Sequence, residues 1–291
     1  LMMLVMIIML MPAAQVSAQR INEVLEARTT LKPGARTESP EVGTVEFRNV
    51  SFHYPSSDKN VLENISFTAK RGETVAFIGA TGSRKTTLVI MAPRFYDATE
   101  GQVLVDGVDV KDYTFDALYD RVGYMTQKAI LFSGDVRGNV LFGASRGGDS
   151  DEDVRKALDL AQASEFVDKM PGGIHAPIAE GGTNVSGGQK QRLSIARALA
   201  RRPEILVFDD SFSALDYRTD AKLRAGLDRE LKDTTRLIVA QRIGTIRDAD
   251  KIIVLDEGKM VGMGTHNELM RTCPVYQEIA RSQLSQEELG A

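Results

Sequence analysis

The chain has 291 residues, enough for about two domains of roughly 150 residues each, and 43% of them are hydrophobic. Charged residues make up 26%, so the composition excludes an intrinsically disordered chain and a collagen-like repeat. A single cysteine, Cys273, excludes a disulfide scaffold. With 36 basic and 40 acidic residues the net charge is −4, so we expect no nucleic-acid partner.

The first eleven residues hold five of the 11 methionines and no polar side chain. A helix needs roughly 20 apolar residues to cross a bilayer, so this run cannot span one alone. A signal peptide is one interpretation, because residues 16–18 resemble a cleavage site, but no basic residue precedes the run. A buried core helix is another, although the run is apolar on all sides. We favour a third interpretation, in which residues 1–28 are the end of a last transmembrane helix, whose beginning is missing, and its cytoplasmic extension.

Residues 17–27 continue a helical pattern, and residues 29–43 contain two prolines and two glycines, which is typical of a linker. We expect one domain over residues 44–291. It begins with β-type runs at 45–50, 61–69 and 73–79. Apolar runs with the composition of buried parallel strands follow at 103–105, 205–208, 237–240 and 252–255.

The segment 79–87 joins a predicted strand to a predicted helix, which is the context of a phosphate-binding loop. In such a loop backbone N–H groups surround the phosphates, Lys85 reaches the β and γ oxygens, and the Thr86 hydroxyl coordinates Mg²⁺. Arg84 replaces the second glycine of the pattern G-x-x-x-x-G-K-[ST], so it can obstruct the phosphates or require a costly positive φ. A coincidental glycine turn is the alternative. The nucleotide-binding residues predicted here are Gly79, Thr81, Gly82, Ser83, Arg84, Lys85, Thr86 and Thr87.

Residues 205–209 form an apolar strand that ends in Asp209, the arrangement that holds Mg²⁺ opposite a phosphate-binding loop. A solvated aspartate at the end of a strand would look the same. Ser186, Gly187 and Gly188 begin a predicted helix and form a second anion cradle. Two cradles suggest that the second serves a nucleotide held by another protomer, with a simple helix cap as the alternative.

Together these segments resemble the nucleotide-binding domain of an ATP-binding cassette (ABC) exporter, from about Thr44 to the C-terminus. The four residues Ser186, Gly187, Gly188 and Gln189 resemble the signature of that family. The resemblance implies ATP and Mg²⁺ as ligands. It also implies an α/β fold: a P-loop NTPase core with a mainly parallel sheet, an N-terminal antiparallel β subdomain, an α-helical subdomain inserted at about 128–200, and an N-terminal helical stump.

Further positions match motifs of the same family. Tyr54 is expected to stack on adenine, and Gln127 to contact Mg²⁺ and the attacking water while joining the helical subdomain to the core. Asp216 matches a loop that crosses the dimer interface. Residues 180–182 resemble a loop that contacts the coupling helices of the membrane domain. The implied metal ligands are Thr86, Gln127 and Asp209.

Three positions depart from the family pattern. Asp210 stands where the pattern has a glutamate base, and Gln241 where it has a histidine that holds the γ-phosphate. Aspartate reaches roughly 1.5 Å less far, and a catalytic group misplaced by about 1 Å costs on the order of 10²-fold in rate. With Gln127, these two are the catalytic residues that the resemblance implies. Together with Arg84, for which we favour weakened ATP binding over a cationic contact with phosphate, they predict a weak ATP site. The alternative is that the three substitutions are unrelated and have no functional meaning.

The sequence therefore predicts an ATPase subunit that powers export by dimerising with a second cassette. We expect a heterodimer in which the signature at 186–189 completes the ATP site of the partner. Upstream helices would hold the cassette at the cytoplasmic face of the plasma membrane. A non-hydrolysing regulatory cassette is the alternative, and a soluble cassette ATPase of DNA or ribosomes is disfavoured by the apolar start and the net charge of −4. Nothing in the residues identifies the cargo.

Overall fold

The computed structural model describes residues 2–27, 29–143 and 148–283, and the chain divides into two compact units, Leu1–Lys32 and Pro33–Ala291. The first unit contains the helix α1 (Met2–Glu26), so the apolar start and its polar continuation form one helix. Met2, Met9 and Leu10 are among its exposed apolar side chains. Of the helices in the described residues, none combines the length and the apolar character needed to cross a membrane.

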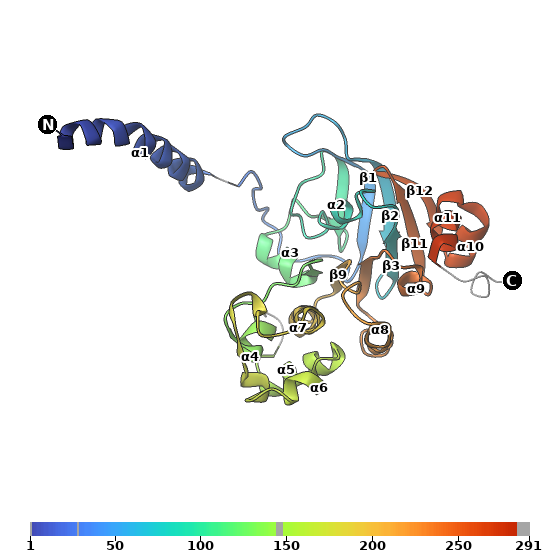
Figure 1. Cartoon of the computed structure of the whole chain (residues 1–291). Helices are drawn as coiled ribbons and strands as arrows, with labels where there is room; N and C mark the ends of the chain where they lie inside the picture. The colour runs from blue at the N-terminus through green and yellow to red at the C-terminus, as the bar shows by residue number, and fades with distance from the viewer. Residues whose placement is uncertain (1, 28, 144–147, 284–291) are drawn as a thin grey trace. The chain divides into compact units, whose positions relative to one another are not determined.

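The second unit is built on two main sheets (Figure 1). Its strands are β1 (Val45–Phe52), β2 (Leu62–Ala69), β3 (Thr74–Ile78), β4 (Glu100–Val105), β5 (Val108–Asp109), β6 (Val122–Met125), β7 (Gly134–Asp135), β8 (Pro177–Ile178), β9 (Ile205–Asp209), β10 (Thr235–Val239), β11 (Lys251–Asp256) and β12 (Lys259–Gly264). The larger sheet has the order β12-β11-β3-β10-β9-β6 and is parallel except for β12. The smaller sheet, β2-β1-β4-β5, is antiparallel. The predicted α/β class, with a mainly parallel sheet and an N-terminal antiparallel sheet, is confirmed.

Helices connect the strands of the larger sheet. Two of them, α2 (Lys85–Val89) and α3 (Phe115–Arg121), precede β6. The segment 128–200 holds α4 (Val136–Val140), α5 (Asp151–Leu160), α6 (Ser164–Asp168), the 3₁₀ turns η1 (Gly173–His175) and η2 (Glu180–Gly182), and α7 (Gly187–Ala200). After β9 come α8 (Tyr217–Glu230), α9 (Ile243–Ile246), α10 (His266–Thr272) and α11 (Pro274–Gln283).

Both faces of the larger sheet are buried. In β3, Val75 and Phe77 pack in a core shared with the antiparallel sheet. Ala76 and Ile78 face the opposite way, into a second core shared with the helices of segment 128–200. Successive side chains of a strand point to opposite faces, so a strand buried on both sides must be apolar throughout, as residues 205–208 are.

One predicted parallel strand belongs to the other sheet. The run 103–105 is the end of β4, which pairs antiparallel with β1. It is apolar throughout because Val103 and Val105 lie in the core while Leu104, on the opposite face, is only 7% exposed. An apolar run indicates burial on both faces, but it does not indicate the direction of pairing, so this prediction was wrong.

Part of the predicted linker packs onto the second unit, which begins at Pro33. The Gly34 N–H donates to the Tyr113 carbonyl at 2.8 Å, and the Arg36 N–H donates to the Asp112 carbonyl at 2.8 Å. A Cβ at Gly34 would lie 2.1 Å from the Asp112 oxygen, so a glycine is required for this close approach. The proline and glycine content indicates an irregular backbone. It does not indicate that this segment packs against residues 112–113, which are far away in the sequence.

A buried polar cluster joins this segment to the sheets. Asp106 is fully buried, and its Oδ1 accepts the Thr44 N–H at 2.8 Å while its Oδ2 lies 3.5 Å from Arg121 Nε. Arg121 Nη2 also donates to the Thr37 carbonyl at 3.0 Å. Burial and the neighbouring Glu204 carboxyl raise the pKa of Asp106 to about 7, against the opposing effects of the Thr44 N–H and Arg121. Below about pH 7 the folded chain therefore favours the protonated acid at this position.

We expect Asp106→Asn to stabilise the chain at alkaline pH. Because the folded-state pKa of Asp106 is raised, the wild type loses stability as pH increases from about 4, the pKa of an unfolded aspartate, to about 7. Asparagine does not ionise, so the advantage of the variant should grow by about 3 kcal/mol between pH 5 and 8.5. Urea unfolding at both pH values measures it, with Asp109→Asn in the same hairpin as control. An identical pH dependence of wild type and Asp106→Asn would contradict the expectation.

Candidate functional site

The predicted phosphate-binding loop runs from the end of β3 to the start of α2. Gly79 has a φ of +158°, and a Cβ there would lie 2.0 Å from the Leu255 carbonyl oxygen, so a side chain does not fit. Gly82 has a φ of +85°, which also favours glycine. The Ser83 N–H donates to the Ala80 carbonyl at 3.1 Å and closes the turn. These contacts fix a tight loop at the carboxyl end of a buried strand.

Lys85 holds its ammonium group inside this loop. Its Nζ donates to the Gly79 carbonyl at 2.8 Å, the Ala80 carbonyl at 3.0 Å and Ser83 Oγ at 3.1 Å. Burial lowers the pKa of Lys85, and the nearby carboxylates of Asp209 and Asp210 oppose that shift. A partly desolvated ammonium that is already held in the loop is suited to bind phosphate oxygens.

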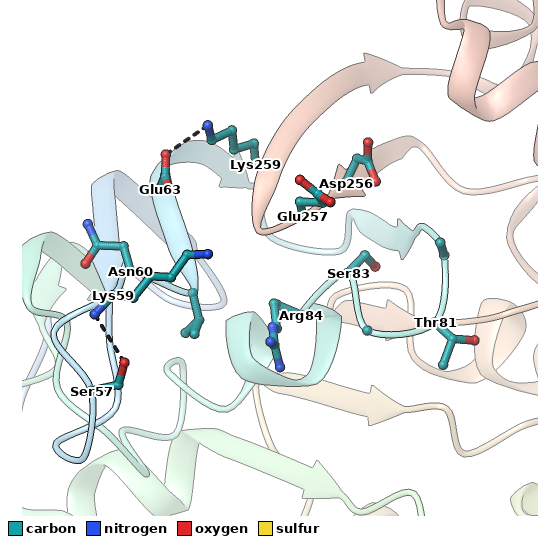
Figure 2. A pocket seen from close by; sticks show the side chains of 13 residues that line it. Ser57, Lys59, Asn60, Glu63, Thr81, Ser83, Arg84, Asp256, Glu257 and Lys259 are labelled. Carbon is teal, nitrogen blue, oxygen red and sulfur yellow. Dashed lines mark hydrogen bonds and ion pairs between the residues drawn. The ribbon is translucent and has the colours of Figure 1, made fainter.

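Arg84 occupies the left-handed region, with φ of 73° and ψ of 24°. The positive φ expected from the glycine pattern is therefore present, and it costs an arginine about 1–2 kcal/mol relative to glycine. Thr81, Ser83 and Arg84 line a cavity of about 810 Å³, together with Lys59 and Glu257 from neighbouring loops (Figure 2). Among the described residues, none forms a hydrogen bond or ion pair with the Arg84 guanidinium. It is an exposed positive charge at the edge of the loop.

Asp209 ends β9 and meets the loop. Its Oδ1 accepts the Thr86 hydroxyl at 2.8 Å, and its Oδ2 accepts the Tyr124 hydroxyl at 2.8 Å. Burial raises the pKa of Asp209, against these two hydrogen bonds. Burial also raises the pKa of Tyr124, which keeps its proton for this bond. Sequence reasoning gave Tyr124 no role, because its contact with Asp209 depends on the pairing of β6 with β9.

The residues present fit a Mg²⁺ ion. The Thr86 hydroxyl and the Asp209 carboxylate are hard oxygen ligands, which Mg²⁺ prefers. In the described part of the chain no three His, Cys, Asp or Glu side chains group into a metal site made by protein alone. Mg²⁺ usually keeps water and takes substrate phosphate oxygens beside one or two carboxylates. Bound there, it would neutralise charge on the phosphates.

Asp210 joins the other two predicted catalytic residues. Its Oδ2 accepts the Gln127 amide at 3.1 Å and the Gln241 amide at 2.6 Å. The backbone at Asp210 has a φ of +50°, and its N–H donates to the Val239 carbonyl at 3.1 Å. Gln127, Asp210 and Gln241 follow the neighbouring strands β6, β9 and β10, whose carboxyl ends meet at one edge of the sheet. One carboxylate oxygen therefore binds both glutamines.

Tyr54 lies beside the start of α2. Its hydroxyl is 3.1 Å from Thr87 Oγ1, and its ring packs edge-on against Phe52 and Tyr96, with centroids 4.9 and 5.4 Å away. The structure thus brings Tyr54 to the phosphate-binding loop. Whether the ring stacks on adenine remains a prediction.

The signature residues lie at the start of α7. The Ser186 N–H donates to Gln189 Oε1 at 2.9 Å, and Ser186 Oγ accepts the Gln189 N–H at 3.3 Å, which is a capping box. Within this chain, Ser186 and Gln189 therefore act as a cap for the start of α7. A Cβ at Gly187 would meet nothing within 4 Å, and one at Gly188 would lie 3.5 Å from the Ala214 oxygen. The folding of the described residues does not require glycine at either position.

Two further predicted loops have defined local structure. Asp216 caps α8, with its Oδ1 accepting the Thr219 N–H at 3.0 Å. Residues 180–182 form the turn η2, in which Gly181 has a φ of +62°. Their predicted contacts with a partner cassette and with a membrane domain involve other chains and stay predictions.

Comparison with known proteins identifies the family. A family model described as "ABC transporter" matches residues 62–213, more than half of the chain. The chain belongs to the ABC transporter family. The matched region of this ABC cassette contains the phosphate-binding loop, Gln127, the signature residues and both aspartates at the end of β9.

Individual relatives agree with this assignment. The ABC cassette is 45% identical to an uncharacterized ABC transporter ATP-binding protein of Mycobacterium tuberculosis, over 96% of this chain and 48% of the relative. It is 40% identical to an ATP-dependent lipid A-core flippase of Pseudomonas aeruginosa, over 87% of this chain and 42% of the relative. A solved bacterial Atm1-family ABC exporter with ATP bound has a TM-score of 0.83 and 31% identity, covering 97% of this chain and 50% of the other. The chain spans about half the length of the relatives it matches.

Proposed function

We propose that the chain is the ATP-binding and ATP-hydrolysing part of an exporter subunit. The observation that carries this proposal is the meeting of Lys85, Thr86 and Asp209 at the carboxyl ends of β3 and β9. Lys85 would bind the β and γ phosphates, Thr86 and Asp209 would hold Mg²⁺, and Gln127 would orient water. The likeness to export proteins supports transport as the purpose of the hydrolysis.

We further propose that the chain's own ATP site is weak. One oxygen of the Asp210 carboxylate, Oδ2, already accepts two amide hydrogen bonds, from Gln127 and Gln241. Gln241 can donate a neutral hydrogen bond to a phosphate but cannot become cationic. Asp210 also lacks one methylene of the reach of a glutamate. A base that is both short and engaged as an acceptor removes a proton from water slowly.

The signature residues would serve a second cassette. Gly187 and Gly188 are free of contacts that demand glycine in this chain, and a glycine with open space above it permits close approach of another molecule's phosphates. We propose a heterodimer in which residues 186–189 complete the partner's stronger site. The rest of the subunit would place the cassette at the cytoplasmic face of the plasma membrane, with coupling helices of the membrane domain against residues 180–182.

A non-hydrolysing regulatory cassette is the second candidate. The engaged carboxylate of Asp210 favours it, because a site that binds ATP without turnover has the same Lys85, Thr86 and Asp209 contacts. Sensitive measurement of ATP turnover separates the two functions.

Titration with MgATP tests the site directly. We expect Arg84→Gly to bind ATP about tenfold more tightly than the wild type, because glycine removes the side chain that stands where backbone approaches phosphate. Lys85→Ala, which removes the ammonium from the loop, should weaken binding by about 100-fold. Isothermal titration calorimetry measures both. Tighter or equal binding by the wild type would contradict the expected weakening by Arg84. Absence of ATP binding by both the wild type and Arg84→Gly would refute the proposed function.

A further inference from the structure

The C-terminal helix α11 reaches the segment that carries Gln241. At its end, Gln283 Nε2 donates to the Gln241 carbonyl at 2.8 Å, and Gln283 Oε1 accepts the Ile243 N–H at 2.9 Å. The Gln283 amide thus binds the backbone on both sides of Arg242. The Gln241 side chain, in turn, donates to Asp210. A continuous series of hydrogen bonds connects α11 to the carboxylate of the ATP site.

Gln283 supplies a cap that α9 lacks. The residue at the N-cap of α9, Arg242, makes no side-chain hydrogen bond to the helix start. The first N–H of a helix has no partner within the helix, so an outside acceptor must bind it. The Gln283 oxygen does so for Ile243. Without Gln283 the start of α9 loses its bond from α11, and Gln241, two residues before Ile243, loses the bond that holds its carbonyl.

The helix that carries Gln283 is firmly anchored. Tyr276 and Ala280, on the buried side of α11, have no exposed surface, and the Tyr276 hydroxyl lies 2.8 Å from His266 Nδ1 on α10. Figure 1 shows α11 beside α10, close to α9, and contacts join α11 to both of these helices. An anchored helix holds its last side chain in a defined place, whereas a loop would not.

We infer that Gln283 is a positioning residue for the ATP reaction, an inference that rests on the proposed function. It fixes the backbone of residues 241–243. That backbone carries the Gln241 amide, which would donate to the γ-phosphate during turnover. Gln283 has no contact with the phosphate-binding loop or Lys85 among the described residues. Its loss should therefore lower turnover and leave ATP affinity unchanged.

The test compares two amides of α11. Gln283→Met removes both bonds to the segment and keeps similar length and volume. The matched control is Gln277→Met, because Gln277 donates to the Met270 carbonyl at 2.9 Å, away from the segment. A third variant, Gln283→Glu, keeps an acceptor for Ile243 but loses the donor to Gln241. Hydrogen exchange at Ile243, the ATP dissociation constant and single-turnover hydrolysis are measured for each.

We expect Gln283→Met to reduce protection of the Ile243 amide about tenfold and to lower hydrolysis several-fold at unchanged ATP affinity. Gln283→Glu should keep the protection and still lower hydrolysis, and Gln277→Met should change neither. Unchanged protection in Gln283→Met, or equal loss in both methionine variants, would overturn the inference. If no protein hydrolyses ATP, the proposed function fails, while exchange at Ile243 still decides whether Gln283 holds the segment.

Discussion

Replacing Asp210 by glutamate and Gln241 by histidine together is expected to raise ATP hydrolysis by the chain about 10²-fold. Glutamate extends the carboxylate by one methylene toward water, and histidine can carry a positive charge toward the γ-phosphate. In the wild type the two side chains bind each other at 2.6 Å, so both positions lie at the same place in the site. Steady-state phosphate release with saturating MgATP measures the effect.

The same double variant with Lys85→Ala is the control, because hydrolysis at the chain's own site requires the lysine held in the loop. This triple variant should release phosphate no faster than a sample without active enzyme. A wild-type chain that hydrolyses ATP as fast as the double variant, and loses this activity on Asp210→Asn, would refute the weak site.

The sequence could predict which residues gather at the site. Asp209, Asp210 and Gln241 each follow an apolar run typical of a buried parallel strand, and the carboxyl ends of such strands meet at one edge. The positive φ at Arg84 was predictable for the same kind of reason, because the loop pattern has glycine there. These features depend on local sequence and on a general rule of parallel sheets.

Other features depend on contacts between distant segments. The Tyr124 hydroxyl reaches Asp209 only because β6 pairs with β9. These two strands are far apart in the sequence, and the residues that separate them do not indicate the pairing. The bond between Gln283 and Ile243 depends on how α11 packs. The wrong assignment of residues 103–105 has the same origin, since β1 determines their pairing. Burial can be inferred from composition, whereas the partner of a strand or side chain cannot.

Gly187→Ala is expected to lower the rate of ATP hydrolysis about 10²-fold in the Asp210→Glu/Gln241→His background. The substitution meets no atom within 4 Å in this chain and replaces glycine by alanine inside α7, where alanine is the better helix former. Folding should therefore not suffer. The added methyl group would instead obstruct the phosphates of a nucleotide that is bound by a second copy.

Mixing tests whether the signature acts on the other chain. The triple variant alone should be inactive, and adding wild-type chain, which has a weak site but an intact signature, should restore a substantial part of the activity. Gly226→Ala in α8, where an added Cβ would meet only the Leu160 side chain at 3.3 Å, controls for the change in helix propensity. Full activity of the triple variant alone would show that Gly187 is not used. A mixture that stays inactive would show that the wild-type signature does not complete the site of another chain, and the proposed exchange between cassettes would fail.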